Sequence, residues 1–434
     1  MGIKHLKAIL LQKKILRSLN SVGKAKELYV DFLGLFMAMA YSVTSTEMLH
    51  HAMKEKFKFM KSIAEKIIVF VDRGNIALKT NLREKRKQSS KNQYLRKIEE
   101  IKNLKSAIKD LSENDIRYEE KRESIIQRIE KHDYYIFLSE KKNIEKVMSD
   151  TLSLLKDVEI CYCHYVDAEF KICCQAKDYY AQNGCWPAIL SSDQDTMCLS
   201  CVDVCDKIIY DTKHVYRLCP DRYTVYLTRL TILVNGCDFF GGLYGISITK
   251  DNCDKYKIFE EFSKENTLKS LIYKNYSLLN FSEKKYSETS ALIDRVFEFI
   301  ILYTSLNEEA YKIQELPKIS VKEFLSTMVF SRWDDAVKEY QLGPDILQNI
   351  RNIYKNKSNQ NALQMIEYYK YRNVNTRVVK KFIATLELEC CDKICMIGVS
   401  STPELYISFE NLFYFNNCSI IENPSKMINI NTEI

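Results

Sequence analysis

Three short apolar runs occur in the first half of the chain, and each ends in one or more acidic residues. "ELYVD" ends on Asp31, "KIIVFVD" ends on Asp72, and "WPAILSSDQD" ends on Asp193 and Asp195. Runs rich in Val, Ile, Leu and aromatic residues, without polar alternation, are typical of strands that are buried on both faces. A helix-compatible segment follows each run, which is the strand–helix rhythm of a largely parallel sheet.

This rhythm predicts the α/β fold class, with a mostly parallel sheet and flanking helices. In such sheets, ligands bind beyond the carboxyl ends of the strands. Three strands from separate segments of the chain would therefore present acids at one edge of one sheet. Carboxylates are the hard oxygen ligands that Mg²⁺ and Mn²⁺ prefer.

A charged segment follows the second run. Residues 81–150 contain neither Gly nor Pro, and nearly half of them are charged. "YLRKIEEIKNLKSAIKDL" and "IRYEEKRESIIQRIEKH" have helical patterning, which predicts a solvated helical hairpin or short coiled coil with i,i+4 ion pairs. Its entrance, residues 79–91, is instead strongly basic, with only Glu84 to offset Arg83, Lys85, Arg86 and Lys87. Such a cluster suits the binding of phosphates near a metal.

A glycine-rich stretch, "LVNGCDFFGGLYGISITKD", occupies residues 233–251 and contains four of the 11 glycines. It lies between the helix-like "YLTRLTILVN" and "KYKIFEEF". Two interpretations stay open. Such a turn allows backbone N–H groups to approach a phosphate closely, and it is also compatible with a plain turn between packed helices.

The stretch "SSDQDTMCLSCVDVC" (residues 191–205) combines the two acids with Cys198, Cys201 and Cys205. The CxxC step permits a zinc-stabilised interaction module, but a structural zinc site needs four ligands, usually in two pairs. The spacing i, i+3 and i+7 also describes one apolar helix face. We favour core packing for the three cysteines.

The composition agrees with an ordinary soluble globular protein. The 434 residues are 46% hydrophobic and 28% charged, and a net charge of +7 permits a nucleic-acid partner without demanding one. The N-terminus has no secretory h-region, and the longest apolar run contains Asp31 and is too short to span a bilayer. Fifteen cysteines then indicate a reducing compartment. After about residue 255 the chain is predicted to be helical, with strands at "KICMIGVSS", "ELYISF" and "NLFYFNN" near its end.

Further acids complete a constellation. "YVDAEF" supplies Asp167 and Glu169, which we place at a loop–helix junction because an i,i+2 pair would diverge on a regular helix. The glycine-rich stretch supplies Asp238. Carboxylates that gather in this way repel one another unless divalent cations bind between them, and two such ions form a phosphodiester-cleaving site. The predicted metal ligands are Asp31, Asp72, Asp167, Glu169, Asp193, Asp195 and Asp238.

At this point the sequence resembles a known family. "MGIKHL", "VDFLGLF", "FVDRG", "DAEF", "SSDQDTM" and "LVNGCDFFGGLYGISIT" are similar to motifs of the flap endonuclease family of structure-specific 5′ nucleases, most closely its poxvirus members. The resemblance covers residues 1 to about 260. It implies a PIN-like (Rossmann-like) core at residues 1–255, with a helical arch insertion at about 80–150 and a helix–turns–helix DNA-binding element at about 225–262. Residues 256–434 would form a C-terminal helical region that ends in short strands.

The resemblance also implies residue roles. The seven acids would bind two Mg²⁺ ions, with Mn²⁺ as a substitute, and Lys79 and Arg86 would be catalytic. A 5′ single strand would thread under the arch. The turn would grip duplex backbone through a bound K⁺, and Gly2 would place its amine near the active site. The predicted DNA-binding residues are Gly2, Phe36, Arg83, Gly245, Ser247 and Lys250.

The chain departs from the family at several positions. Asp167 stands where cellular members have Glu, so its reach is shorter. Ser247 stands where the family has Gly, which puts the K⁺ site in question. Phe36 is the aromatic nearest to the family's base-stacking tyrosine, and core packing is its alternative role. No clamp-binding peptide is seen at the C-terminus.

The function expected from sequence is a Mg²⁺-dependent nuclease that acts on flapped, nicked or branched DNA. The resemblance implies a role in viral DNA replication, recombination or repair in the host cytoplasm, with DNA and viral replication proteins as partners and no membrane partner. The main alternative is a catalytically weak DNA-junction-binding scaffold of a viral replication complex.

Overall fold

The computed structural model describes residues 2–112, 117–275, 286–313, 316–325, 396–398 and 406–408. These residues belong to two compact units. Unit 1 comprises Met1–Thr224, Cys237–Phe239 and Leu302–Glu315, and unit 2 comprises Val225–Gly236, Phe240–Ile301 and Leu316–Ile434. Each unit is therefore assembled from separate stretches of the chain. The domain boundary expected near residue 255 stays a prediction.

Unit 1 is built on a seven-stranded sheet in the order β1-β7-β6-β5-β2-β3-β4. The pairs β2–β3, β2–β5, β3–β4 and β5–β6 are parallel, while β7 pairs antiparallel with β1 and β6. The predicted α/β class with a mostly parallel sheet is thus confirmed. The strands are β1 (Leu16–Leu19), β2 (Ala25–Asp31), β3 (Ala64–Arg73), β4 (Glu159–His164), β5 (Ala188–Leu190), β6 (Lys207–Tyr210) and β7 (Val215–Leu218).

The central strands are buried on both faces, as their unbroken apolar runs predict. On β2, Val30 belongs to the core of one face, whereas Tyr29 belongs to the core of the other face. The first core contains residues of α2 (Phe32–Ala40), α3 (Thr46–Ile63) and α6 (Lys141–Ser153), and the second contains residues of α7 (Ala168–Asn183). Helices therefore cover both faces of the sheet. The carboxyl edge of the sheet lies at the ends of β2, β3 and β5.

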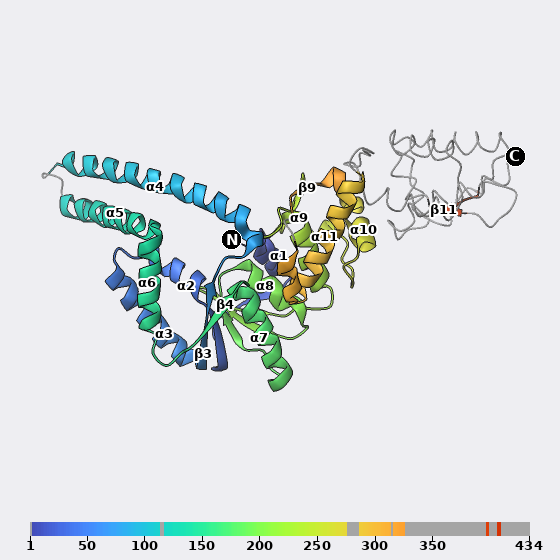
Figure 1. Cartoon of the computed structure of the whole chain (residues 1–434), viewed down its shortest axis with the longest axis horizontal. Helices are drawn as coiled ribbons and strands as arrows, with labels where there is room; N and C mark the ends of the chain where they lie inside the picture. Colours follow the sequence, from blue (N-terminus) through green and yellow to red (C-terminus); the bar gives the residue numbers. More distant parts are fainter. Residues whose placement is uncertain are drawn as a thin grey trace. The chain divides into compact units, whose positions relative to one another are not determined.

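The charged segment forms a helical hairpin, as expected. Helices α4 (Thr80–Lys109) and α5 (Tyr118–Ser139) lie side by side in unit 1 (Figure 1). Between them, Tyr135 Oη donates to Gln93 Oε1 at 2.8 Å, and Glu100 lies 3.0 Å from His132 Nε2. Such contacts between polar side chains hold together two helices that have few apolar positions. Two short helices complete this unit, α1 (Leu6–Gln12) and α8 (Gln194–Leu199).

Unit 2 contains the glycine-rich turn. Helix α9 (Thr224–Asn235) precedes the turn, and β8 (Leu243–Tyr244) within it pairs with β9 (Ile319–Ser320). The later elements are α10 (Lys264–Asn275), α11 (Tyr286–Thr304), β10 (Met396–Gly398) and β11 (Tyr406–Ser408). The last two strands lie within "KICMIGVSS" and "ELYISF", whereas "NLFYFNN" lies outside the described residues.

The helix predicted at "KYKIFEEF" is wrong. Only the 3₁₀ turn Cys253–Lys255 enters this stretch, and α10 begins at Lys264. Aromatic packing accounts for the absence of a helix in this described stretch, because Phe259 and Phe262 both pack against the ring of Tyr226. Ser263 then caps the helix that follows, accepting a hydrogen bond from the Asn266 N–H at 3.2 Å.

The cysteines after the third acidic run lie partly in the core. Cys198 and Cys201 are buried, and the Cys201 thiol donates to the Met197 carbonyl at 3.2 Å. Burial raises the pKa of this thiol to about 12, which disfavours the thiolate that zinc requires. Cys205 lies beyond the helix and is partly exposed. No helix in the described part of the chain is both long and apolar enough to cross a membrane.

Candidate active site at the sheet edge

The first two acids lie at the ends of adjacent parallel strands. Asp31 ends β2 and caps α2, with Oδ1 accepting from the Gly34 N–H at 3.1 Å and Oδ2 from the Ser191 hydroxyl at 3.1 Å. Asp72 lies near the end of β3, and its Oδ1 accepts from the Ala168 N–H at 2.7 Å. The hydrogen bond from Ala168 joins the end of β3 to the first turn of α7.

The Asp-x-Glu pair lies at a loop–helix junction, as predicted. Asp167 is the residue before α7, and Glu169 lies in the first turn of that helix. One carboxylate oxygen from each of Asp72, Asp167 and Glu169 lies within 4.8 Å of the other two. Three hard oxygen donors at this spacing suit one divalent cation.

The third acidic run contributes at the start of α8. Asp193 caps this helix by accepting from the Asp195 N–H at 3.0 Å, and Asp195 Oδ1 accepts from the Ile3 N–H at 3.0 Å. Gly2 lies against both acids with a φ of +46°, and a Cβ there would collide with Asp193 Oδ1. The structure therefore brings the N-terminus to these carboxylates, where only glycine fits.

The two predicted catalytic cations meet the remaining acid. Lys79 Nζ lies 2.6 Å from Asp167 Oδ1 and 3.5 Å from Asp238 Oδ2, and its side chain is only 12% exposed. The Arg86 guanidinium donates to Asp238 Oδ2 at 2.7 Å from the second turn of α4, with 41% of its side chain exposed. Lys79 is therefore an internal ion-pair partner, whereas Arg86 is open to solvent.

The acids perturb one another strongly. Burial raises the pKa of Asp31 to about 6, with the charges of Asp72 and Asp193 adding to the effect. Burial likewise raises the pKa of Asp195 to about 8, helped by Asp193 and Asp238. The pKa of Glu169 is raised well above its usual range by burial and by the charges of nearby acids, Asp31 among them.

Mutual repulsion of this kind links all seven predicted ligands into one electrostatic cluster. Burial lowers the pKa of Lys79, but the charges of Asp167, Glu169 and Asp238 outweigh it and leave that pKa raised. One ammonium cannot neutralise so many carboxylates. The donor set therefore fits divalent cations, which would relieve the repulsion.

The predicted DNA-binding residues lie in different places. Arg83, on the first turn of α4, donates to Asn75 Oδ1 at 2.9 Å. Phe36 is fully buried and packs against Phe32, at 5.7 Å between ring centroids. This burial contradicts the predicted stacking on a base, and the core-packing alternative is correct because α2 turns Phe36 toward the sheet.

Three further predicted residues lie in the glycine-rich turn of unit 2. Gly245 (φ +104°), Ser247 and Lys250 are all exposed. The turn is fixed by Asn235, whose side chain donates to the Ile248 carbonyl at 2.7 Å and accepts from its N–H at 2.8 Å. The role of these residues in binding DNA stays a prediction.

Two other glycines account for the tightness of that turn. Gly236 and Gly242 have φ values of +80° and +75°, and a Cβ on Gly242 would lie 2.6 Å from the Gly236 backbone nitrogen. Their backbones are packed directly against each other, so a larger residue at either position would displace the turn.

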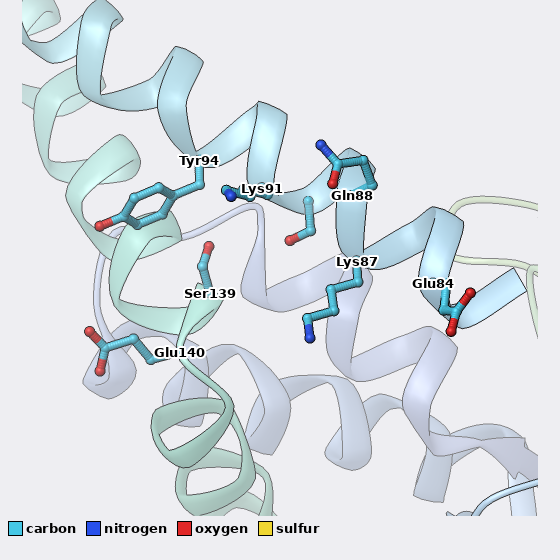
Figure 2. A pocket seen from close by; sticks show the side chains of 8 residues that line it. Glu84, Lys87, Gln88, Lys91, Tyr94, Ser139 and Glu140 are labelled. Carbon is cyan, nitrogen blue, oxygen red and sulfur yellow. The ribbon is translucent and has the colours of Figure 1, made fainter. Parts of the chain in front are cut away.

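A groove opens between the charged helices of unit 1. It has a volume of about 650 Å³ and is lined by Lys87, Lys91 and Tyr94 of α4, together with Ser139 and Glu140 (Figure 2). Figure 2 shows the Lys87 side chain pointing from α4 toward the groove. The α4 wall of the groove therefore carries two cationic groups, Lys87 and Lys91, and one acidic group, Glu84.

Sequence reasoning missed Tyr303 and Tyr311. The Tyr303 hydroxyl donates to Asp195 Oδ2 at 3.3 Å, and the Tyr311 hydroxyl donates to Asp167 Oδ2 at 3.2 Å. Both tyrosines lie beyond residue 260, where the resemblance ends, and the chain contains 28 tyrosines. No spacing pattern distinguishes these two from the others.

The fold and the site define an α/β protein with a buried carboxylate cluster at the carboxyl edge of a mostly parallel sheet. The chain belongs to the Poxvirus G5 protein family, whose model matches residues 1–421. The resemblance to flap-endonuclease-like poxvirus proteins that the sequence motifs indicate is thereby confirmed.

Individual relatives match along nearly the whole chain. "Protein FPV117" of Fowlpox virus (strain NVSL) is 57% identical over 439 residues, covering 99% of this chain and 100% of its own. "Putative nuclease OPG089" of Variola virus is 32% identical over 449 residues, with the same coverage. A solved structure of T5 5′-exonuclease with bound zinc has 13% identity and a TM-score of 0.35, covering 70% of this chain and 98% of its own.

Proposed function

We propose that this protein is a divalent-metal-dependent, structure-specific DNA nuclease. The observation that carries the proposal is the grouping of Asp72, Asp167 and Glu169 within 4.8 Å at the sheet edge, with the Lys79 ammonium against them. A protein that only binds DNA has no use for carboxylates facing a polyanion. The name of the variola virus relative, which includes the word nuclease, also supports it.

The seven acids are the residues that would hold metal ions. Their oxygen donors suit two Mg²⁺ ions, with Mn²⁺ as a substitute. When bound, such ions supply an activated water at neutral pH and stabilise the leaving oxygen of a phosphodiester. The raised pKa values of Asp31 and Asp195 support this assignment, because bound cations would offset the burial and the repulsion that raise them.

The two cations of the site have separate tasks in this proposal. Lys79 holds Asp167 and Asp238 in place and keeps positive charge beside the position of the scissile phosphate. Arg86, which is more exposed, contacts the phosphate directly. When DNA binds, its ion pair with Asp238 is replaced by an ion pair with the phosphate. Fixed positive groups of this kind offset the charge that develops in the transition state.

The rest of the chain would select DNA by shape. The hairpin of α4 and α5 would surround a single-stranded 5′ end, with Arg83 at its base. Gly245, Ser247 and Lys250 would hold duplex backbone, with K⁺ bound at the turn. Phosphate contacts carry no sequence information, so specificity would come from flaps, nicks or branches.

The biological setting belongs to the same proposal. The nuclease core, which includes the arch and the turn element, would comprise residues 1–255. Residues 256–434 would form a C-terminal region. The protein would act in viral DNA replication, recombination or repair in the host cytoplasm, alongside viral replication proteins.

Cleavage of a 5′-flap oligonucleotide in the presence of Mg²⁺ tests the proposal. The wild-type protein should cut the flap substrate, and the Asp193→Ala/Asp195→Ala variant should not. Asp206→Ala is the matched control, because Asp206 pairs with Arg217 on the surface of the same unit and should leave cleavage intact. Tight binding of the junction without cleavage by the wild type would favour a scaffold instead.

A further inference from the structure

The chain returns to unit 1 late in the sequence. After α11 leaves unit 2, residues 302–313, here called the return segment, belong to the same unit as the acidic cluster. Lys171 on α7 pairs with Glu308 at 3.3 Å, and the Cys174 thiol donates to the Leu306 carbonyl at 3.7 Å. The return segment is therefore attached to the helix that begins at Asp167.

The segment places two tyrosine hydroxyls on two carboxylates. Tyr311 Oη accepts from the Asp167 N–H at 3.4 Å and donates to Asp167 Oδ2 at 3.2 Å, while Lys79 lies 2.6 Å from Asp167 Oδ1. Both oxygens of Asp167 are thereby held in one orientation.

Asp195 is held by the same pattern. Its Oδ1 accepts from the Ile3 N–H at 3.0 Å, and its Oδ2 accepts from the Tyr303 hydroxyl at 3.3 Å. In each carboxylate, one oxygen is held by a group from the N-terminal part of the chain (Lys79 or Ile3) and the other by a tyrosine of the return segment. Since every carboxylate oxygen has a second lone pair, both remain able to bind a cation.

The rings of Tyr303 and Tyr311 are also held by aromatic packing. Tyr303 and Tyr311 both pack against Phe170 and Phe239, at ring-centroid distances of 5.1 to 5.8 Å. This aromatic cluster fixes the rings independently of the hydroxyl groups. Replacing either tyrosine by phenylalanine therefore removes the hydrogen bond to the carboxylate and keeps the packing.

We propose that Tyr303 and Tyr311 are positioning residues that orient Asp195 and Asp167 for divalent-metal binding. The inference rests on the proposed function, since it assigns these carboxylates to metal ions. Groups that hydrogen-bond to metal-ligating carboxylates fix their orientation, and losing one weakens metal affinity by roughly 10- to 100-fold. The metal site thus depends on a part of the chain that lies beyond the sequence motifs, which end near residue 260.

Titration of the full-length protein with Mn²⁺, followed by calorimetry and by the EPR signal of free Mn²⁺, tests the inference. We expect Tyr311→Phe and Tyr303→Phe to bind Mn²⁺ roughly 10-fold or more weakly than the wild type, with an unchanged thermal unfolding midpoint. Tyr226→Phe is the matched control. It removes a buried hydroxyl that donates to the Asn266 carbonyl at 3.1 Å in unit 2, and it should leave Mn²⁺ affinity unchanged.

Wild-type Mn²⁺ affinity in both tyrosine variants would overturn the inference and leave the proposed function standing. Weak Mn²⁺ binding that accompanies a large drop in the unfolding midpoint would also overturn it, because the hydroxyls would then maintain the fold rather than the site. Absence of Mn²⁺ binding by the wild type would instead refute the proposed metal-dependent function itself, and the positioning role with it.

Discussion

Lys79 places an ammonium group among the acids at the sheet edge, in contact with Asp167 and Asp238. The family resemblance nominated it from sequence, because it lies seven residues after Asp72, as the family pattern requires. Six of the acids were equally accessible to sequence reasoning, because each lies at the end of a buried strand or at the start of a helix, whereas Asp238 was found in the glycine-rich turn. The buried position of Phe36 could not be predicted in this way, since an aromatic residue next to a site has the same sequence pattern whether it faces the ligand or the core.

Replacing Lys79 by Ala should reduce cleavage of a 5′-flap substrate about 100-fold or more, because one fixed electrostatic group at a reacting centre contributes on that order. Single-turnover rates at saturating Mg²⁺ measure the effect. Lys85→Ala is the control, since Lys85 is exposed on α4, the helix that follows Lys79, and its rate should stay near that of the wild type. Equal losses in the two variants would argue that Lys79 contributes only general positive charge.

The pKa values of Asp31 and Asp195 predict a pH dependence for the metal-free protein. Both pKa values in the folded state, about 6 and about 8, exceed the ordinary value of 3.8. The unfolded chain therefore releases these protons at lower pH than the folded chain, so stability falls as pH rises from about 4 through about 8. In EDTA, the unfolding midpoint should be lower at pH 8.5 than at pH 5.5.

Two comparisons identify the cause of that difference. Asp195→Asn should reduce the pH dependence, because the amide cannot titrate, and saturating Mg²⁺ should raise the midpoint most at the higher pH. If Asp195→Asn retained the full wild-type difference in EDTA, burial of this carboxyl would not be its source.

At the scale of elements, the hairpin of α4 and α5 followed directly from sequence, because a long segment without Gly or Pro and rich in charge has few other structures available. The segment "KYKIFEEF" shows where this reasoning fails. Its spacing suits a helix, yet Phe259 and Phe262 pack against Tyr226, and these long-range contacts override local helix propensity. Such contacts are not encoded in the spacing of one segment.

The α4 wall of the groove predicts a salt-dependent contribution to DNA binding. Lys87→Ala/Lys91→Ala should weaken binding of a flap with a long 5′ single strand by several-fold and reduce the dependence of log Kd on log salt concentration, because two phosphate contacts are lost. Fluorescence anisotropy at several salt concentrations measures both quantities. Lys102→Ala/Lys105→Ala, at exposed positions farther along α4, is the control, and an identical effect there would exclude a specific role for the groove.

At the scale of the whole molecule, unit 1 is assembled from three stretches of the chain. The parallel direction of most strands followed from the strand–helix rhythm, whereas the order of the strands in the sheet was not predicted. The return of residues 302–313 did not, because nothing in a tyrosine-rich helical sequence indicates which distant carboxylates its hydroxyl groups will contact. The sequence-predicted core at residues 1–255 consequently omits Tyr303 and Tyr311.

A chain that ends at residue 255 should therefore bind Mn²⁺ more weakly and unfold at lower temperature than one that ends at residue 325, which keeps the return segment. Loss of the segment exposes Phe170 and Phe239 and removes two hydroxyl partners of the acids. Mn²⁺ titration and thermal unfolding of both chains measure the difference. Equal Mn²⁺ affinity in the two would show that the metal site is complete without the segment.

The proposed nuclease activity requires that seven carboxylates from separate segments form one divalent-metal site. Anomalous diffraction from crystals soaked in Mn²⁺ would locate the bound ions. We expect two anomalous peaks roughly 3.5–4 Å apart, with ligands drawn from Asp31, Asp72, Asp167, Glu169, Asp193, Asp195 and Asp238. The absence of any peak at this sheet edge in fully soaked crystals would contradict the proposal.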